Sequence, residues 1–297
     1  FEPFIVSGLA TDTEKVGKTI GELVKAQGLS EKDKQLLFIF PDGLTANSNL
    51  LIKSIQGGLG YHVNILGGSA GNDFQMATKT FQFCNQDILN DSVAGVLITG
   101  DFDYHVEVSH GCKALGRPRT LTKTSANRLV EIDNEPALNT LRNIIDKSSM
   151  DDIAVVNLIS FGESFQGKGY SSDMLIRAIF GFNDEEGTIQ LAAQIPQGAD
   201  VRIVRRDPDK VISATTEMTE RLVASLKDPE NAVYFYVNCA FRGTTLFGDD
   251  SGPDVTAIRE IMGTDKDMMG FYSFGEFAPI QGENCFHNQT GVLLAME

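Results

Sequence analysis

Two charged residues at the ends of expected strands have side chains suited to binding a zwitterion. Arg242 follows the apolar run 232–237, and its planar guanidinium can hold a carboxylate through two parallel hydrogen bonds. Glu276 lies between Phe274 and Phe277, where a carboxylate needs a partner because burial of an unpaired charge is costly. That partner would be Arg242 or the ammonium group of a ligand. An ordinary intramolecular ion pair is the structural alternative for Arg242.

A glycine-rich turn, GGSAG at residues 67–71, follows another expected strand. It matches the G-x-S-x-G pattern, in which Ser69 would be the nucleophile of an α/β-hydrolase. That pattern requires a helix directly after the turn, whereas residues 75–83 favour a strand. The backbone N–H groups around Gly68 could instead face an oxyanion of a ligand. A tight turn without a ligand is the remaining interpretation.

The histidines and cysteines carry the other candidate chemistry. His110 ends an expected strand, and His287 and Asn288 come just before the last strand, in FHNQT. A partly buried, hydrogen-bonded histidine is the ordinary interpretation of each. The sequence contains no H-E-x-x-H motif or close His/Asp cluster, so no metal site is predicted. Cys239 would be a nucleophile only if a histidine lowered its pKa, and a small buried side chain is its common role.

Composition narrows the class of protein. The chain has 297 residues, and its net charge of −15 would repel phosphate backbones, so no nucleic-acid partner is expected. No apolar run approaches the roughly 18 to 20 residues that a bilayer span needs, and no signal peptide begins the sequence. The four cysteines form no C-x-x-C pair. We therefore expect a cytoplasmic protein without membrane insertion.

The elements that position these residues follow from the apolar pattern. The first third predicts a β-α-β-α-β order, with some parallel sheet and right-handed crossovers. Its strands are expected at residues 4–7, 36–40 and 63–66, and its helices at residues 11–27 and 50–57.

After the glycine-rich turn, short apolar runs with turns between them predict an antiparallel meander. Its strands are expected at residues 78–83, 92–99, 105–109, 119–124 and 129–132, followed by a helix at 135–146. In the second half we expect strands at 153–158, 175–179, 188–192, 201–204, 232–237, 269–274 and 292–295, and helices at 208–226 and 255–262. The predicted fold class is α+β, with two sheet-and-helix halves at residues 1–149 and 150–297.

Taken together, these motifs resemble those of the FIST domains, sensory modules of bacterial signalling proteins that also occur in eukaryotic F-box proteins. GGSAG, His110-Gly111 and LTKTSANRLVEIDNEPAL are similar to the family's N-terminal region. NCAFR, GFYSFGEFAP and FHNQT, in this order, are similar to its C-terminal region and are the specific part of the resemblance. The family's turn often carries cysteine and serine where this chain has Gly67 and Gly68, so no role for a turn cysteine is expected.

The resemblance implies a ligand-binding sensory domain rather than an enzyme. It implies a small-molecule ligand, with amino acids as the leading class, and an output partner such as a histidine kinase, a cyclase or a chemotaxis component. No cofactor is expected, unless the chain resembles the haem-binding nitric-oxide sensors of the family. In that alternative His110, His287 or His62 would be the axial ligand. A hydrolase using Ser69 or Cys239 is the third hypothesis.

The expected ligand site lies between the two halves. Arg242 would hold the carboxylate of a zwitterion, Glu276 its ammonium group, and Asn288 or the GGSAG backbone its remaining polar atoms. The candidate ligand-binding residues are therefore Arg242, Glu276, Asn288, Ser69, Gly68, His287 and His110. No catalytic or metal-binding residue is predicted.

Overall fold

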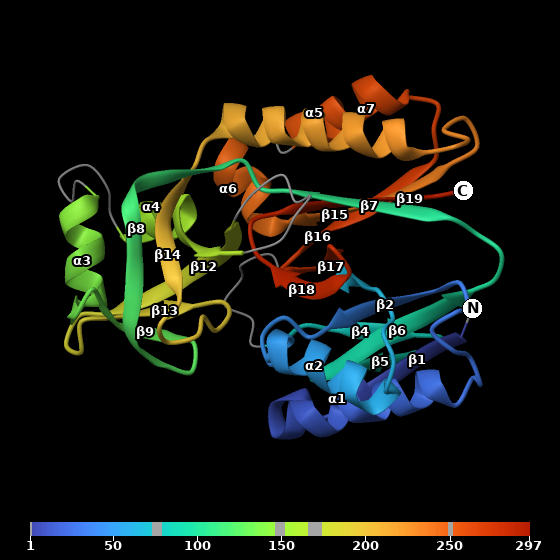
Figure 1. Ribbon diagram of the computed structural model, residues 1–297, viewed down its shortest axis with the longest axis horizontal. Helices are drawn as coiled ribbons and strands as arrows, with labels where there is room; N and C mark the ends of the chain where they lie inside the picture. The colour runs from blue at the N-terminus through green and yellow to red at the C-terminus, as the bar shows by residue number, and fades with distance from the viewer. Residues whose placement is uncertain (1, 73–78, 146–151, 166–173, 249–251) are drawn as a thin grey trace.

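The structure is a computed structural model, and it describes residues 2–72, 79–145, 152–165, 174–248 and 252–297. Figure 1 shows two stacked sheets covered by helices on their outer faces, with a third group of strands at one side. This combination of mixed sheets and helices confirms the predicted α+β class.

The six-stranded sheet is built mainly from the N-terminal part of the chain. Its order is β1 (Glu2–Ser7), β6 (Ser92–Thr99), β2 (Gln35–Pro41), β3 (Ile65–Gly68), β17 (Glu276–Ile280) and β18 (Glu283–His287). Only β2 and β3 run parallel among these neighbours. Helices α1 (Leu9–Lys25) and α2 (Ser48–Leu59) cover its outer face (Figure 1).

The four-stranded sheet packs against the inner face of the six-stranded sheet. Its order is β16 (Met268–Ser273), β15 (Val233–Cys239), β19 (Gly291–Met296) and β7 (Tyr104–Ser109). Buried side chains of both sheets form the core between them, including Phe38, Leu66, Val237 and Leu294. Helices α5 (Pro208–Ser225) and α7 (Pro253–Met262) cover the outer face of this sheet (Figure 1).

Seven of the remaining strands form a barrel. Their order is β10 (Glu135–Pro136), β9 (Arg128–Ile132), β13 (Thr188–Leu191), β12 (Met174–Asn183), β11 (Ile159–Ser164), β14 (Asp200–Arg206) and β8 (Cys112–Ser125). Because β8 pairs with β9 as well as with β14, these strands close on themselves. Helices α3 (Ala137–Ile144) and α4 (Asp152–Leu158) accompany the barrel, and β4 (Gln82–Cys84) and β5 (Asp87–Leu89) form a separate hairpin.

The three large sheets each combine strands from both parts of the chain. Strands β17 and β18 join the N-terminal sheet, β7 joins the C-terminal sheet, and β8, β9 and β10 join β11 to β14. The expected boundary between residues 149 and 150 lies outside the described residues. Because strands from both sides of that boundary share each large sheet, the sheets do not divide the chain at that point in the sequence.

Among the differences between the predicted and observed elements, two affect the strands around the site. We expected a strand at residues 153–158, where the chain forms α4 and the strand begins only at Ile159. A short apolar run does not distinguish a buried helix from a buried strand by its periodicity. The β17–β18 hairpin was not predicted, although its turn at Gln281 and Gly282 has the positive φ angles of a tight hairpin turn. None of the helices in the described ranges is long and apolar enough to cross a bilayer.

Candidate functional site

The predicted site residues converge where the three sheets meet. Gly68 pairs with Glu276 between β3 and β17, and Glu276 pairs with His287 between β17 and β18. Backbone bonds join the two motifs: the N–H of Ser69 donates to Gly275 O at 2.8 Å, and the N–H of Phe274 donates to Ser69 O at 2.9 Å. The GGSAG and GFYSFGEFAP segments therefore form one structural unit.

The glycines of the turn permit close packing. A Cβ on Gly67, whose φ is +136°, would lie 1.9 Å from Ile39 O. A Cβ on Gly68 would lie 2.7 Å from both Ser273 Cβ and Val237 Cγ1. The N–H groups of the turn also have protein acceptors, since that of Ala70 donates to Pro41 O at 2.8 Å. The two central donors of the turn are thus engaged within the protein.

Glu276 is fully buried and has specific hydrogen-bond donors. Its Oε1 accepts from the Ser273 hydroxyl at 2.8 Å, and its Oε2 accepts from the Thr290 hydroxyl at 2.7 Å and the Thr290 N–H at 3.2 Å. Burial raises the pKa of Glu276 to about 7, although these hydrogen bonds oppose the shift. The side chain of Cys239 is a further hydrogen-bond partner, so the carboxylate is close to the four hydrogen bonds that it can accept.

Arg242 lies in the single-turn helix η1 (Ala240–Arg242), directly after β15. One Nη donates to Ser109 O at 2.8 Å, and the other donates to the Thr215 hydroxyl at 2.6 Å and the Tyr236 hydroxyl at 3.3 Å. Asp254 lies 3.6 Å from the same nitrogen. Both members of this ion pair are fully buried.

This arrangement differs from the predicted clamp. Arg242 and Glu276 are both present in the same buried region, but each side chain already has protein partners. The charge of Arg242 is balanced by Asp254, which also accepts hydrogen bonds from Tyr236 and Asn238. A ligand carboxylate at Arg242 would have to compete with these internal contacts.

The remaining predicted residues, His287, Asn288 and His110, are also buried. His287 donates from Nε2 to Ala278 O at 3.1 Å, and burial lowers its pKa to about 3, so the imidazole is neutral. Asn288 accepts from the Ala178 N–H in β12 at 3.2 Å, and Nδ1 of His110 accepts from the Cys112 N–H at 2.8 Å. All seven predicted residues are therefore part of the protein interior.

A small cavity of about 10 Å³ opens beside this region, room for about one water molecule. It is lined by Ala178, Phe180, Ala192, Cys239, Phe241, Phe274 and Asn288. Phe180 is half exposed and lies at the outer side of this group, whereas Cys239 and Phe241 are buried.

Sequence analysis missed Arg206, the last residue of β14. Its side chain is only 1% exposed, donates to Phe241 O, and places its guanidinium carbon 5.4 Å from the centre of the Phe241 ring. Burial lowers its pKa to about 10. The strand alternation contained a signal, because Arg206 shares the face of Val204, which is fully buried.

Several buried polar atoms of the site have no hydrogen-bond partner within the described part of the chain. They include Ser69 Oγ, Arg206 Nε and Nη2, Arg242 Nε, His287 Nδ1 and Gln289 Nε2. Buried polar groups in native proteins are nearly always hydrogen-bonded to protein, water or ligand. Apart from Arg206, the residues named here belong to the predicted motifs, which marks this region as the candidate site.

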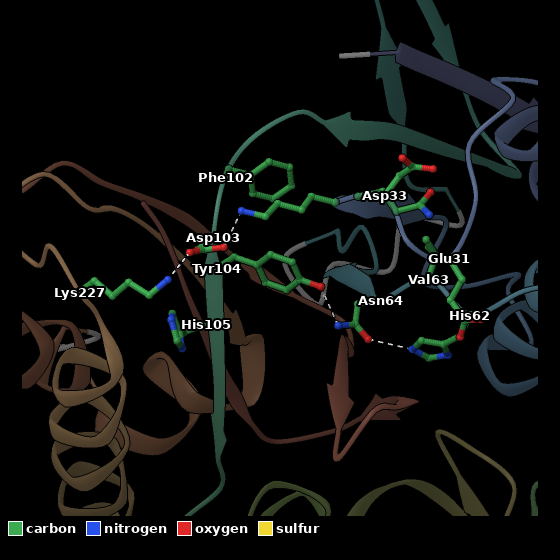
Figure 2. A pocket seen from close by; sticks show the side chains of 12 residues that line it. Glu31, Asp33, His62, Val63, Asn64, Phe102, Asp103, Tyr104, His105 and Lys227 are labelled. Atoms are coloured by element: carbon green, nitrogen blue, oxygen red, sulfur yellow. Dashed lines mark hydrogen bonds and ion pairs between the residues drawn. The ribbon is translucent and has the colours of Figure 1, made fainter.

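Larger hollows lie elsewhere. One pocket has a volume of about 470 Å³. In it, Lys34 and Lys227 both bond to Asp103, and Asn64 bridges Tyr104 and His62 (Figure 2). A second hollow of about 390 Å³ is lined in part by Arg177 and Glu283. None of the seven predicted residues lines either hollow. The first is an ion-pair network at the surface, because its lysines and Asp103 are exposed.

The other hypotheses find little support in the geometry. The cavity beside Asn288 is far too small for a porphyrin, and the two hollows that His62 lines carry several charged side chains, whereas a haem pocket is mostly apolar. Burial raises the pKa of the Cys239 thiol well above its usual range, which keeps it protonated. The Ser69 hydroxyl has no base as a partner in the described ranges. These ranges also contain no group of three or more His, Cys, Asp or Glu residues that could hold a metal ion.

Comparison with known proteins gives two family matches and several relatives. The family model for the FIST N domain matches residues 4–135, and that for the FIST C domain matches residues 135–279. An uncharacterized protein of Mycobacterium bovis is 28% identical over 97% of this chain and 75% of its own length. Another uncharacterized protein, from Mycobacterium tuberculosis, is 26% identical over 91% of this chain and 70% of its own length.

Proposed function

Since the chain belongs to the FIST family, which is associated with sensory signal transduction, we propose that it binds a small amino acid or related carboxylate at this buried polar site. The observation that carries the proposal is the group of polar atoms at the site that lack partners, described above. An output protein such as a histidine kinase, a cyclase or a chemotaxis component would respond to the occupied state.

The polar groups of the site suit an amphoteric ligand. Glu276 is a buried carboxylate that accepts hydrogen bonds from neutral protein donors, and Nδ1 of the neutral His287 is an acceptor without a partner in the described residues. A ligand ammonium group would supply donors to both. Donors without partners, among them Gln289 Nε2, would bond to the oxygens of a carboxylate.

The segment from His287 to Thr290 would transmit the effect of a bound ligand to the rest of the molecule. Asn288 bonds to β12 of the barrel, and Thr290 bonds to Glu276 in the six-stranded sheet. The N–H of Cys239, at the end of β15 in the four-stranded sheet, donates to Thr290 O at 2.9 Å. A ligand that moves this segment would therefore act on all three sheets at once.

Ligand entry requires a local opening of the protein. The cavity of about 10 Å³ holds about one water molecule, whereas an amino acid needs several times that space. The aromatic side chains that line it, Phe180, Phe241 and Phe274, would have to move apart. A ligand that binds only the opened form shifts the population toward that form, which is the change that a sensor transmits.

The test is a thermal-shift screen of amino acids and small carboxylates. A ligand at about 100 times its dissociation constant adds about 2.7 kcal/mol to stability, which gives a measurable rise in Tm. Glu276→Gln removes the charge that faces the ammonium group, so we expect binding of the hit to weaken about ten- to a hundred-fold.

Asp103→Asn, in the surface pocket of Figure 2, is the control and should bind the hit like the parent protein. The proposal is wrong if no compound in the screen raises Tm. It is also wrong if the hit binds Glu276→Gln as tightly as the parent and loses affinity in Asp103→Asn.

A further inference from the structure

Arg206 presents two donors on one edge of its guanidinium. Its Nη1 bonds to Phe241 O, whereas Nε and Nη2 have no partner among the described residues. In a planar guanidinium, the Nε–H and the adjacent N–H of Nη2 point the same way and form a fork. This fork matches the two oxygens of a carboxylate.

The charge of Arg206 is also unbalanced. Two other buried arginines have carboxylate partners, Arg177 with Glu163 at 2.9 Å and Arg242 with Asp254 at 3.6 Å. No ion pair within the described ranges includes Arg206, and its electrostatic neighbours are Cys112, Cys239 and the cation of Arg242. A buried charge is normally paired, so the surroundings of Arg206 suit an anion.

We propose that Arg206 binds the carboxylate of the ligand through its Nε and Nη2 donors, in place of the expected Arg242. The inference rests on the proposed function and assigns one end of the ligand to a specific residue. Cys112 connects Arg206 with a second donor: it pairs with Arg206 between β8 and β14, and its Sγ lies 3.9 Å from Gln289 Oε1. The Nε2 of that Gln289 amide has no partner in the described residues.

Phe241 provides the connection between Arg206 and the small cavity. Its ring lies against the Arg206 guanidinium and also lines the cavity with Cys239 and Asn288. Displacement of this ring would join the cavity to the unpaired donors. The arrangement favours a monoanion, because one fork supplies two hydrogen bonds and a buried dianion would keep an uncompensated charge.

Thermal shift with simple anions tests the inference without knowledge of the natural ligand. We expect potassium formate and acetate to raise Tm in a saturable way, beyond potassium chloride or phosphate at equal ionic strength. Arg206→Lys keeps the charge but loses the fork, and Arg206→Met loses both. In each variant the acetate dissociation constant should rise about ten- to a hundred-fold.

The ligand-free stability separates a binding role from a structural one. Replacing an unpaired buried charge with an apolar side chain of similar size is often neutral or stabilising, so Arg206→Met should have a Tm equal to or above that of the parent. Arg177→Met is the matched control, because its guanidinium bonds to Glu163 and Phe286 O. This control should lower Tm and keep the acetate effect.

Three results would overturn the inference: no carboxylate effect beyond the chloride control, an acetate effect that persists in Arg206→Lys, or a larger effect of phosphate than of acetate. If Arg206→Met does not fold, Arg206 is structural, and the idea survives only if Arg206→Lys folds and loses the acetate effect. A metabolite that depends on Glu276 but binds Arg206→Lys with full affinity would leave the proposed function standing without this residue. If acetate binds at Arg206 but no metabolite of the screen raises Tm, the carboxylate site at Arg206 stands and the proposed function does not.

Discussion

At the scale of single residues, the site is defined by buried groups whose charge state differs from that in water. Glu276 has its pKa raised to about 7 by burial, and His287 has its pKa lowered to about 3 for the same reason. His287 is therefore neutral at physiological pH, whereas Glu276 is divided between its protonated and ionised forms near pH 7. Ligand binding that supplies an ammonium group would favour the charged form of Glu276 and so couple binding to proton release.

The raised pKa of Glu276 predicts a specific pH dependence of stability. Because the folded pKa lies above the unfolded value, Glu276 contributes stability that is fully present below about pH 4.5 and is lost as pH rises through about 7. Glu276→Gln should therefore gain stability relative to the parent over this window, by up to about 3 kcal/mol. Chemical denaturation of both proteins at several pH values measures the difference.

Glu14→Gln is the control, because Glu14 forms an exposed ion pair with Lys18, and such pairs contribute little to stability. A difference between Glu276→Gln and the parent that stays constant from pH 4.5 to 7.5 would contradict the assigned ionisation. Comparison with the parent at each pH removes the contribution of His287, which is common to both proteins.

At the scale of elements, close backbone packing positions the site. Gly68 lies where β3 meets β17 and where the six-stranded sheet contacts β15 and β16. The turn that follows is bonded to the β16–β17 connection through Ser69 and Gly275. Space for a side chain is absent at this point, so the glycine determines how closely the two sheets approach.

Gly68→Ala should therefore be destabilising. Its Cβ would lie 2.7 Å from Ser273 Cβ and Val237 Cγ1, so both strands would have to shift. We expect a loss of roughly 1 to 3 kcal/mol in unfolding free energy, as for other overpacked cores. The matched control is Gly57→Ala in α2, where a Cβ meets nothing within 4 Å and helix propensity should add roughly 0.5 to 1 kcal/mol. Equal stability of the two variants in urea denaturation would contradict this account.

The sequence predicted many of the individual elements but not their assembly. The apolar run at residues 92–99 gave β6 with its observed bounds, and α5 and α7 were found within two residues of their ends. Pairing between distant strands has no local signal, so the pairing of β8 with β14 and of β9 with β13, which completes the barrel, was not predicted. The same limit applies to the contacts of the candidate residues: the pairing of Arg242 with Asp254 and the bond between Thr290 and Glu276 were not predicted.

At the scale of the whole molecule, each sheet is completed by strands that are remote in sequence. The six-stranded sheet includes β17 and β18, which follow its other strands by nearly two hundred residues of chain, roughly the length of a domain. The core between the two stacked sheets takes side chains from β2, β3 and β7 as well as from β15, β17 and β19. A ligand bound at the junction of the sheets, as proposed above, would therefore act on a single packed structure.

This interleaving predicts that the fragments 1–149 and 150–297 do not fold alone. The first lacks β17 and β18, and it would expose the face of β2 and β3 that packs on the four-stranded sheet. The second lacks β8 and β9, so its barrel strands β13 and β14 would be unpaired edges. We expect each fragment to show the circular dichroism of an unfolded chain or to aggregate, and the intact chain to unfold in one cooperative transition.

Co-expression of the two fragments should restore a folded complex, because all the strands are then present. Near-native circular dichroism and cooperative unfolding of the isolated 1–149 fragment would show instead that the halves are independent domains.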